Sequence, residues 1–581
     1  MIPFLQSHSG LTSRVSSIFA NNEPGVWLDP SDFSTMFQDS AGTVPVTAVE
    51  QPVGLMLDKS KGMVLGPELV TNGTFDTNLD GWSTIAPATA IWTSSGIQIS
   101  RNITSFVSQA ASVVNLVAGR TYKVSLSVTS APSAGNASLG IFAANRSTER
   151  TAPGTVLFNT AKDFAFIFTA SVTEAAYVVC GISGVTAGTV TFDNISVREL
   201  LGNHALQTTT TSRPVLSARV NLLTKTEQFE DTSVWSVGAA VTADTTVAPN
   251  ATQTADTVTV NNQATMLYQA NAANGDGSYI AEISLTKASG DNFFYFYVSD
   301  AGNNYAGAWV NLVTMQLGTV TAAGTFSGTT ATLNQQENGF KRLRLNLTKP
   351  ATTSSHLGFS PCSSDGSFTR VIGQNVILWG ASLVSADQAH LPYQRVNTAT
   401  DYDTAGFPHY LRFDGVDDFL STTTITPGTD KVQVFAGVRK LRDAAVAVVA
   451  DLGPGNTAGS FVAYIQNPFG YGFNSVGSAS TSAAQATTAF QAPITNTLAG
   501  LGDISGDSTI LRINGTQAAI NTADQGTGNY LAYPLYIGRR GGTTLPFNGH
   551  LYSLIVRFGS NLPIETIENT EKYINGLTKA Y

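Results

Sequence analysis

Carboxylates that could act as acid or nucleophile occur in the chain, but not at the spacing that catalysis needs. Glucanases with a β-sandwich fold place the general acid and the nucleophile on one face of a strand, in an E-x-D-x-x-E pattern. That pattern is absent. The nearest group is Asp414, Asp417 and Asp418. Aspartates at such positions are typical of turns whose backbone N–H groups they cap, so we favour that interpretation and keep calcium binding or catalysis as the alternative.

The histidines and cysteines form no recognisable metal or nucleophile motif. The six histidines are single, without an HExxH pattern, and His204 in a Gly-Asn-His-Ala segment is interpreted as structural. Cys180 and Cys362 lie far apart without a CxxC pattern, so we expect two buried free thiols. The sequence also contains no GxSxG elbow or phosphate-binding glycine loop between a strand and a helix. It therefore predicts a protein that is not an enzyme.

Sugar binding requires other residues, namely flat aromatic faces for the CH surface of the sugar and polar groups for its hydroxyls. Trp92, Tyr305 and Trp309 are the candidates, because each falls in a segment expected to be a strand that could face a groove. Packing within a core is the alternative for all three. Trp82 and Trp235 follow the opening segments of two similar units and are interpreted as core residues.

The amino-acid composition limits the number of domains and the binding partners that we expect. The 581 residues suffice for about three or four domains. The formal net charge is -9 and the 31 Lys and Arg residues are scattered, so we expect no nucleic-acid partner. Residues 1–20 contain no uninterrupted apolar stretch, so we expect neither a secretory signal nor membrane insertion. An adhesin-like chain of this kind would reach the outside by another route, such as assembly into a particle released by lysis.

The elements that must position these residues are strands. Residues 121–128, 293–298, 432–438 and 551–558 alternate with period two between turn residues, which predicts antiparallel β-sandwiches. One short helix is predicted at the C-terminus, with Pro563 in its first turn and Gly576 at its end. The predicted fold class is thus all-β.

An internal repeat divides the strands into units. Residues 69–76 (LVTNGTFD), followed by Trp82, resemble residues 222–230 (LLTKTEQFE), followed by Trp235. The units also end alike, since residues 190–197 (VTFDNISV) match residues 376–383 (VILWGASL). First and last strands that pair side by side predict two jelly rolls.

Both units resemble the CenC-type carbohydrate-binding jelly roll. The first has its N-G-x-F-D…G-W opening and F-D-N-I-S-V ending, whereas the second lacks the Asn-Gly pair and has Leu378-Trp379 in place of Phe-Asp. The resemblance covers about half of the chain. It implies a structural calcium ion near Asp76 and Asp193 in the first unit only, with turn capping without metal as the alternative. No other cofactor is expected.

A second resemblance connects distant segments. Residues 410–420 (YLRFDGVDDFL), 511–515 (LRING), 535–539 (LYIGR) and 547–552 (FNGHLY) resemble laminin-G/concanavalin-like sandwiches, in which Asn-Gly forms a two-residue hairpin turn. Such domains in phage and bacterial surface proteins often begin upstream with segments like 26–32 (VWLDPSD), 57–62 (LDKSKG), 201–207 (LGNHALQ) and 213–215 (RPV). Because the first jelly roll separates these segments, we predict one discontinuous laminin-G-like domain with inserted modules.

The expected organisation follows. Residues 1–22 form an N-terminal arm that orders on a neighbouring subunit. Residues 23–62 begin the laminin-G-like domain, 63–200 form the CenC-like jelly roll, 201–218 are a laminin-G-like segment or linker, 219–400 form the second jelly roll, and 401–581 complete the laminin-G-like domain with the C-terminal helix.

The resemblances imply a structural virion protein of a tailed bacteriophage. We expect a fibre or tail-associated component, on the surface of the tail or head, that binds host-surface glycans and contacts other virion proteins. A homo-oligomer is expected, with a trimer as the working assumption, because multivalency strengthens weak sugar contacts. The alternatives are a purely architectural capsid or tail decoration protein and, less favoured, the accessory region of a secreted glycoside hydrolase.

Overall fold

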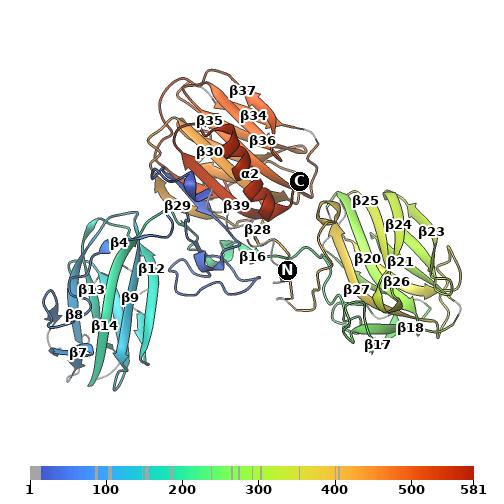
Figure 1. The fold of residues 1–581 in the computed structure, drawn as a ribbon, viewed down its shortest axis with the longest axis horizontal. Helices are drawn as coiled ribbons and strands as arrows, with labels where there is room; N and C mark the ends of the chain where they lie inside the picture. Colours follow the sequence, from blue (N-terminus) through green and yellow to red (C-terminus); the bar gives the residue numbers. More distant parts are fainter. Residues whose placement is uncertain are drawn as a thin grey trace.

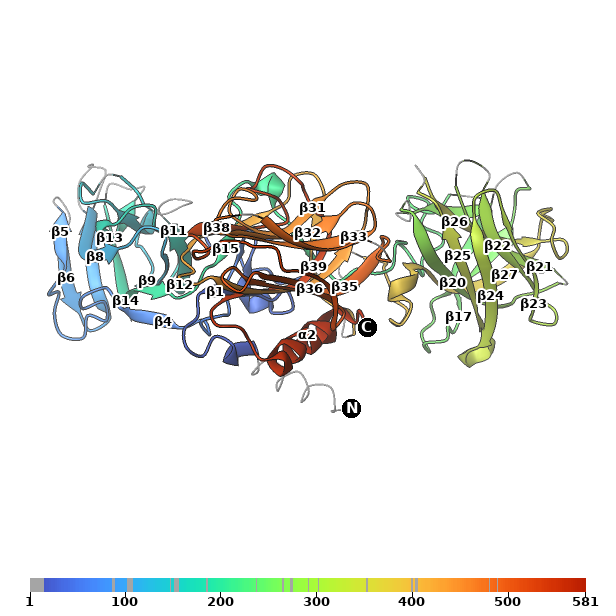
Figure 2. The same cartoon turned by 90° about the horizontal axis from the view of Figure 1, so that it is seen from above.

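The computed structural model describes residues 15–581 apart from short gaps at 86–88, 102–107, 147, 151–155, 184–186, 237, 264–265, 272–274, 291, 301, 303, 352–353, 399–400, 403–405, 480 and 488. Nearly all regular structure in this part of the chain is antiparallel β-strand, arranged in three bodies that lie in a row (Figure 1). Figure 2 shows the two layers of the central body edge-on, with a jelly roll on each side. The predicted all-β, multi-domain fold is confirmed.

The central body is a sandwich of two sheets. One sheet has the order β16 (Val215–Ser217), β28 (Tyr410–Asp414), β39 (Asn548–Phe558), β30 (Lys431–Lys440), β35 (Ile494–Asp503), β36 (Ser508–Ile513) and β37 (Thr516–Asn521), and β1 (Gly25–Leu28) also pairs with β39. The facing sheet has the order β2 (Met36–Phe37), β3 (Leu55–Met56), β15 (Ala205–Leu206), β29 (Leu420–Ile425), β38 (Tyr533–Ile537), β31 (Ala447–Leu452), β32 (Ser460–Gln466), β33 (Gly470–Val476) and β34 (Thr481–Ala486). Alternate side chains of both sheets, such as Leu554 and Phe461, fill one core.

Three separate stretches of the chain build this sandwich. Val26 of β1 lies opposite Val556 of β39, and β15 lies between β3 and β29. Val26 and Met56 are fully buried in the same core as Leu554. The sandwich is therefore discontinuous, as predicted, and the first jelly roll is inserted between β3 and β15.

The first jelly roll packs two sheets. One contains β12 (Lys162–Thr169), β9 (Thr121–Ser130), β14 (Gly188–Leu200), β7 (Gly96–Arg101) and β6 (Thr89–Thr93), with β4 (Leu65–Glu68) on β14, and the other contains β11 (Val156–Phe158), β10 (Asn136–Phe142), β13 (Glu174–Ser183), β8 (Ser108–Leu116) and β5 (Ser83–Ile85). The N–H of Leu69 donates to the carbonyl of Val197 at 3.0 Å. The opening and closing segments are thus neighbours, as predicted. A module with adjacent ends can be inserted into a loop of another domain with little loss of stability.

The second jelly roll repeats this plan. One sheet contains β17 (Ala239–Thr246), β18 (Ala255–Val260), β27 (Asn375–Ser385), β20 (Gly277–Lys287), β25 (Lys341–Lys349) and β24 (Ser327–Gln335), and the other contains β19 (Leu267–Ala270), β26 (His356–Cys362), β21 (Phe293–Ser299), β22 (Tyr305–Asn311) and β23 (Gln316–Ala323). Its opening segment also meets its last strand, because the N–H of Leu222 donates to the carbonyl of Leu383 at 2.8 Å. Trp235 is fully buried against Phe229 and is a core residue, as expected.

Short 3-10 helices connect the strands, at η1 (Phe33–Thr35), η2 (Thr210–Ser212), η3 (Glu337–Gly339) and η4 (Ala386–Gln388). The C-terminal helix α2 (Ile564–Thr578) lies across the outer face of the sheet that contains β30, β35 and β39 (Figure 2). The predicted stop at Gly576 is wrong, because the helix continues to Thr578 and Lys579 takes the left-handed conformation that closes it. A buried ion pair between Arg512 and Glu571, 2.8 Å apart, fastens α2 to the sheet. No helix in the described part of the chain is long and apolar enough to cross a membrane.

The N-terminal segment packs on its own chain. Residues 15–17 are helical, and Val15, Ile18 and Phe19 are buried in a cluster with Trp27 and Ile574. The expected arm is therefore wrong for residues 15–19, since these apolar side chains are covered by the central sandwich and α2 and need no neighbouring subunit. Residues 1–14 of the expected arm lie outside the described residues.

One buried carboxylate joins the chain on the two sides of the inserted jelly roll. Asp58 is fully buried, and its Oδ1 accepts the backbone N–H groups of Trp27 and Ser60, each at 2.8 Å. Its Oδ2 accepts the N–H of Asn203 at 2.7 Å. Asp58 therefore connects three segments of the chain. These are β1 with Trp27, the segment with Ser60 where the chain leaves the sandwich, and the segment with Asn203 where the chain returns.

His204 completes this Asp58 junction. Its Nδ1 accepts the backbone N–H of Asp58 at 2.9 Å, and its Nε2 lies 3.1 Å from the carbonyl of Leu200. An acceptor at Nδ1 and a donor at Nε2 define a neutral imidazole, and burial lowers the pKa of His204 accordingly. The histidine is structural, as its sequence context predicted.

We predict that Asp58→Ala loosens the central sandwich, because two buried and one partly buried backbone N–H groups lose their acceptor at a cost of about 3–5 kcal/mol. Amide hydrogen exchange in β1 and β39, measured by mass spectrometry, should accelerate by about 100-fold or more. The control is Asp163→Ala, which removes an exposed carboxylate that accepts one hydrogen bond from Ser127 in the first jelly roll. Unchanged exchange in the Asp58 variant would show that the strand pairs hold without the junction.

Candidate functional site

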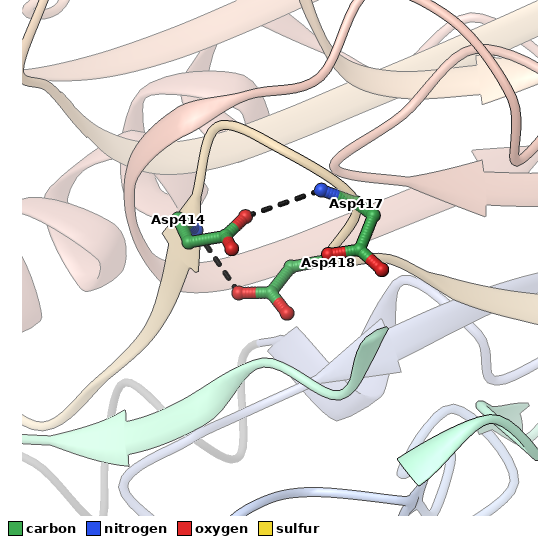
Figure 3. A group of neighbouring side chains, drawn as sticks. All are labelled: Asp414, Asp417 and Asp418. Carbon is green, nitrogen blue, oxygen red and sulfur yellow. Dashed lines mark hydrogen bonds between the residues drawn. The ribbon is translucent and has the colours of Figure 1, made fainter. Parts of the chain in front are cut away.

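The acidic turn of the central sandwich is built as a backbone cap. Oxygens of Asp414, Asp417 and Asp418 lie within 4.8 Å of one another (Figure 3). Asp414 accepts the N–H groups of Val416 at 2.7 Å and Asp417 at 3.3 Å, and Asp418 accepts the N–H of Asp414 at 3.0 Å. Burial and the charge of Asp414 raise the pKa of Asp418 to about 7. These bonds agree with turn capping.

Asp76 and Asp193 are brought to one place by the pairing of the opening and closing segments. The N–H of Ile195 donates to the carbonyl of Gly73 at 2.9 Å, and β14 has a register shift between Asp193 and Ser196. Burial raises the pKa of Asp193, and the negative charge of Asp76 adds to that shift. Asp193 accepts the N–H of Asn194 at 2.8 Å and Asp76 accepts the hydroxyl of Thr74 at 3.0 Å, as the turn-capping alternative expects. Carboxylate oxygens are also ligands that Ca²⁺ uses, although Ca²⁺ needs about six to eight oxygens in all.

Trp92 lies at the edge of the first jelly roll. It is 42% exposed on β6, the last strand in the order of its sheet, and its Nε1 donates to the carbonyl of Phe75 at 2.5 Å. Its neighbour Ile91 is also exposed. Trp92 thus offers a single aromatic face, apart from the other two candidates.

Tyr305 and Trp309 belong to a larger group on the second jelly roll. Side chains at alternate positions of β19, β21, β22 and β26 point away from the core, and a loop after β26 adds one more ring. We call this group the aromatic face, and it comprises Tyr268, Tyr295, Tyr297, Tyr305, Trp309, His356 and Phe368. The core side of β21 is formed by Phe294, Phe296 and Val298.

The rings of the aromatic face are fixed by the backbone beneath them. Tyr295 and Tyr297 are stacked with centroids 5.1 Å apart and an angle of 9° between planes. A Cβ at Gly307 would lie 2.6 Å from the ring of Tyr295, and one at Gly358 would lie 2.5 Å from the hydroxyl of Tyr297. Both tyrosines therefore lie flat on the sheet because glycines occupy the positions below them.

Phe368 covers part of the aromatic face. Its ring meets those of Tyr295 and Trp309 edge-on, with centroids 5.0 and 5.3 Å away. Trp309 is only 1% exposed, and its Nε1 donates to the carbonyl of Ser367 at 2.9 Å. The ring of Trp309 is consequently covered, in agreement with the packing alternative, and it contacts Phe368, which is 44% exposed.

Other rings of the aromatic face are accessible to solvent around Trp309 and Phe368, and polar groups lie near them. Tyr268 is 36% exposed beside His356, and Tyr297 and Tyr305 are half-buried. Asp300 and Asn304 lie where β21 ends and β22 begins, next to Tyr305, and they supply carboxylate and amide groups. The arrangement combines flat apolar surface with hydrogen-bonding groups, which is the chemistry that a sugar ring requires.

Sequence reasoning missed most of this face. Tyr268, Tyr297, His356 and Phe368 were not candidates. A usable signal exists in residues 294–297 (FYFY), where two phenylalanines alternate with two tyrosines, so that the more polar ring of each pair points outward.

Both cysteines are buried free thiols, as expected. Burial raises the pKa of Cys362 to about 12 and raises that of Cys180 further. Neither thiol is activated as a nucleophile.

Comparisons with known proteins find only distant similarities to solved structures. No protein-family model matches the sequence, and no curated protein matches it. A Ruminococcus gnavus IT-sialidase CBM40 bound to α2,3 sialyllactose is 21% identical and covers 24% of this chain and 83% of its own, with a TM-score of 0.21. The tandem CBM22-1–CBM22-2 domain of Paenibacillus barcinonensis Xyn10C is 7% identical over 58% of this chain and 100% of its own, with a TM-score of 0.25. Domains LG4-5 of the mouse laminin α1 chain are 12% identical over 48% of this chain and 82% of theirs, with a TM-score of 0.21.

Proposed function

We propose that this protein is a non-catalytic adhesion protein that binds glycans on the aromatic face of its second jelly roll. The observation that supports the proposal is the aromatic face, on which Tyr268 and Phe368 are partly exposed and Tyr297 lies flat over Gly358. Asp300 and Asn304 supply polar groups in the turn that precedes Tyr305. Each ring can stack on the CH side of a sugar, and the polar groups can bind its hydroxyls.

We propose further that the protein acts on the surface of a tailed phage particle, as a fibre or tail-associated component. Support comes from the resemblance of residues 26–32 and 410–420 to phage surface proteins. Single stacking contacts are weak, so an oligomer such as a trimer would raise the avidity of attachment. The architectural alternative uses the same folds for protein contacts only, and sugar binding separates the two.

Substitutions on the aromatic face test glycan binding. We expect purified protein to bind glycans on a printed array of bacterial surface polysaccharides, and Tyr268→Ala and Phe368→Ala each to weaken the strongest interaction by about three- to tenfold, because each removes about 0.5–1.5 kcal/mol of stacking. Titration calorimetry with the best-bound oligosaccharide measures the loss.

The matched control is Phe469→Ala, which removes a similarly exposed ring (40%) from the central sandwich. An array without any binding would favour the architectural alternative, and binding that neither variant weakens would place the site elsewhere. Release of reducing sugar from the bound polysaccharide would contradict the non-catalytic part of the proposal.

Location on a virion is tested by electron microscopy. We expect gold-labelled antibody against this chain to decorate purified particles of the phage that encodes it, at the tail or at the head. Label that stays with soluble host material and never with particles would overturn the virion role, without affecting the result on sugar binding.

We also propose that Asp76 and Asp193 hold a structural calcium ion. Ca²⁺ would offset the repulsion between the two carboxylates and join the opening segment to β14. Saturating Ca²⁺ should raise the melting temperature of the first jelly roll by about 3 °C or more, EDTA should reverse this, and Asp193→Asn should abolish it. The control is Asp418→Asn in the acidic turn. A response lost in Asp418→Asn and kept in Asp193→Asn would assign the ion to the acidic turn instead.

A further inference from the structure

A cavity of about 230 Å³ lies where the second jelly roll meets the central sandwich. Its lining includes three arginines and three rings, Arg219, Arg412, Arg439, Tyr279, Tyr410 and His550. The cavity is separate from the aromatic face, because Tyr279 belongs to the opposite sheet of the second jelly roll.

The cationic wall of the cavity is set by strand register. Arg412 of β28 and Arg439 of β30 both lie opposite His550 of β39, so the three side chains form a row across adjacent strands. Leu411 and Phe413, which flank Arg412, point into the sandwich core, so the row lies on the outer face of the sheet.

Contacts between the two bodies hold the walls in place. Arg439 pairs with Asp387 of η4, with Nη2 and Oδ1 3.2 Å apart, and Thr495 donates to Asp387 at 2.8 Å. The hydroxyl of Tyr410 donates to the carbonyl of Arg219 at 2.5 Å. The cavity is therefore a built feature of the junction.

Each arginine keeps donors that no described protein group accepts. Arg439, only 4% exposed, uses Nε and Nη2 on Asp387 and Ser385, which leaves Nη1. Arg219 uses Nε and Nη2 on the carbonyls of Asn221, Leu222 and Leu223, which also leaves Nη1. Arg412 contacts Glu50 through Nη2, 3.2 Å from Oε2.

One of the three guanidinium groups, that of Arg219, forms no ion pair with a described residue. Arg439 pairs with Asp387 and Arg412 pairs with Glu50, while the charge of Asp276 acts on Tyr279 from the jelly-roll side. His550 stays neutral, because burial and the charges of Arg439 and Arg412 lower its pKa well below its usual value. One further anion would neutralise the group and accept the remaining N–H donors.

The remaining walls are those of a sugar site. Tyr410 stacks on His550 with centroids 3.8 Å apart and planes 6° from parallel, and Tyr279 lines the cavity from the jelly roll. Tyr279 and Tyr410 are 3% and 2% exposed, so they add only a small apolar part to the wall, which a pyranose can contact and an inorganic anion makes no use of. The volume admits a ligand of about one ring.

We propose that this cavity binds an acidic monosaccharide unit, with its carboxylate held by Arg412, Arg439 and Arg219 and its ring against the part of the wall that Tyr279 and Tyr410 line. This inference rests on the proposed function. It adds a second glycan-binding site to the aromatic face and names acidic sugars as its ligand class. It does not use Tyr268 or Phe368, so its failure and that of the aromatic face are measured separately.

The test uses the full chain, with D-glucuronate and D-galacturonate as probes and D-glucose and inorganic phosphate as comparisons. Titration calorimetry should show saturable uronate binding and none of glucose. Arg412→Gln should weaken uronate binding at least about tenfold, since a charged hydrogen bond contributes about 1.5–3 kcal/mol. Arg412→Glu should abolish it.

Arg198→Gln is the matched control, because Arg198 is 43% exposed and pairs with Glu68 in the first jelly roll, whereas Arg412 is 42% exposed and pairs with Glu50. Hydrogen exchange in β28 and β39 checks that the Arg412 variants keep their fold. Absence of uronate binding, or binding that Arg412→Gln leaves unchanged in a folded protein, would overturn the proposal. Phosphate that binds as tightly as uronate would overturn the sugar assignment.

Discussion

The architecture depends on the buried carboxylate of Asp58. A sandwich whose strands come from three separated stretches of chain needs a link between the points where the chain leaves and returns. Asp58 provides it through charge-assisted hydrogen bonds to Trp27, Ser60 and Asn203, and His204 supports Asp58 from the other side. The jelly roll can be inserted at this point, because its own first and last segments are neighbours.

Much of the fold could be predicted from the sequence, because period two and turn residues act locally. Asn514 and Gly515 form the expected left-handed turn between β36 and β37. The same dipeptide at Asn548 and Gly549 lies inside β39 instead, where a Cβ on Gly549 would lie 2.3 Å from the carbonyl of Arg439. One glycine gives a turn and the other a close approach of strands, and only the tertiary fold distinguishes the two.

The candidate sites were harder to predict, because they depend on which side of a strand faces solvent and on loops that arrive from elsewhere. Trp309 was found as an aromatic residue in a strand, but Phe368, about 60 residues further along the chain, buries it. The helix end was misplaced because Lys579, and not Gly576, adopts the left-handed conformation that ends the helix, although glycine adopts it more readily. The row of Arg412, His550 and Arg439 joins three strands whose register the sequence does not state.

The glycines beneath Tyr295 and Tyr297 have a consequence for recognition. A ring that rests on bare backbone, with a neighbour stacked against it, has few other rotamers to visit. On other surfaces, side chains lose conformational entropy when a ligand binds. Tyr295 and Tyr297 have already lost this entropy on folding. Binding to the aromatic face should therefore be close to rigid-body association. Its selectivity among ligands should depend on the fixed distance between the rings.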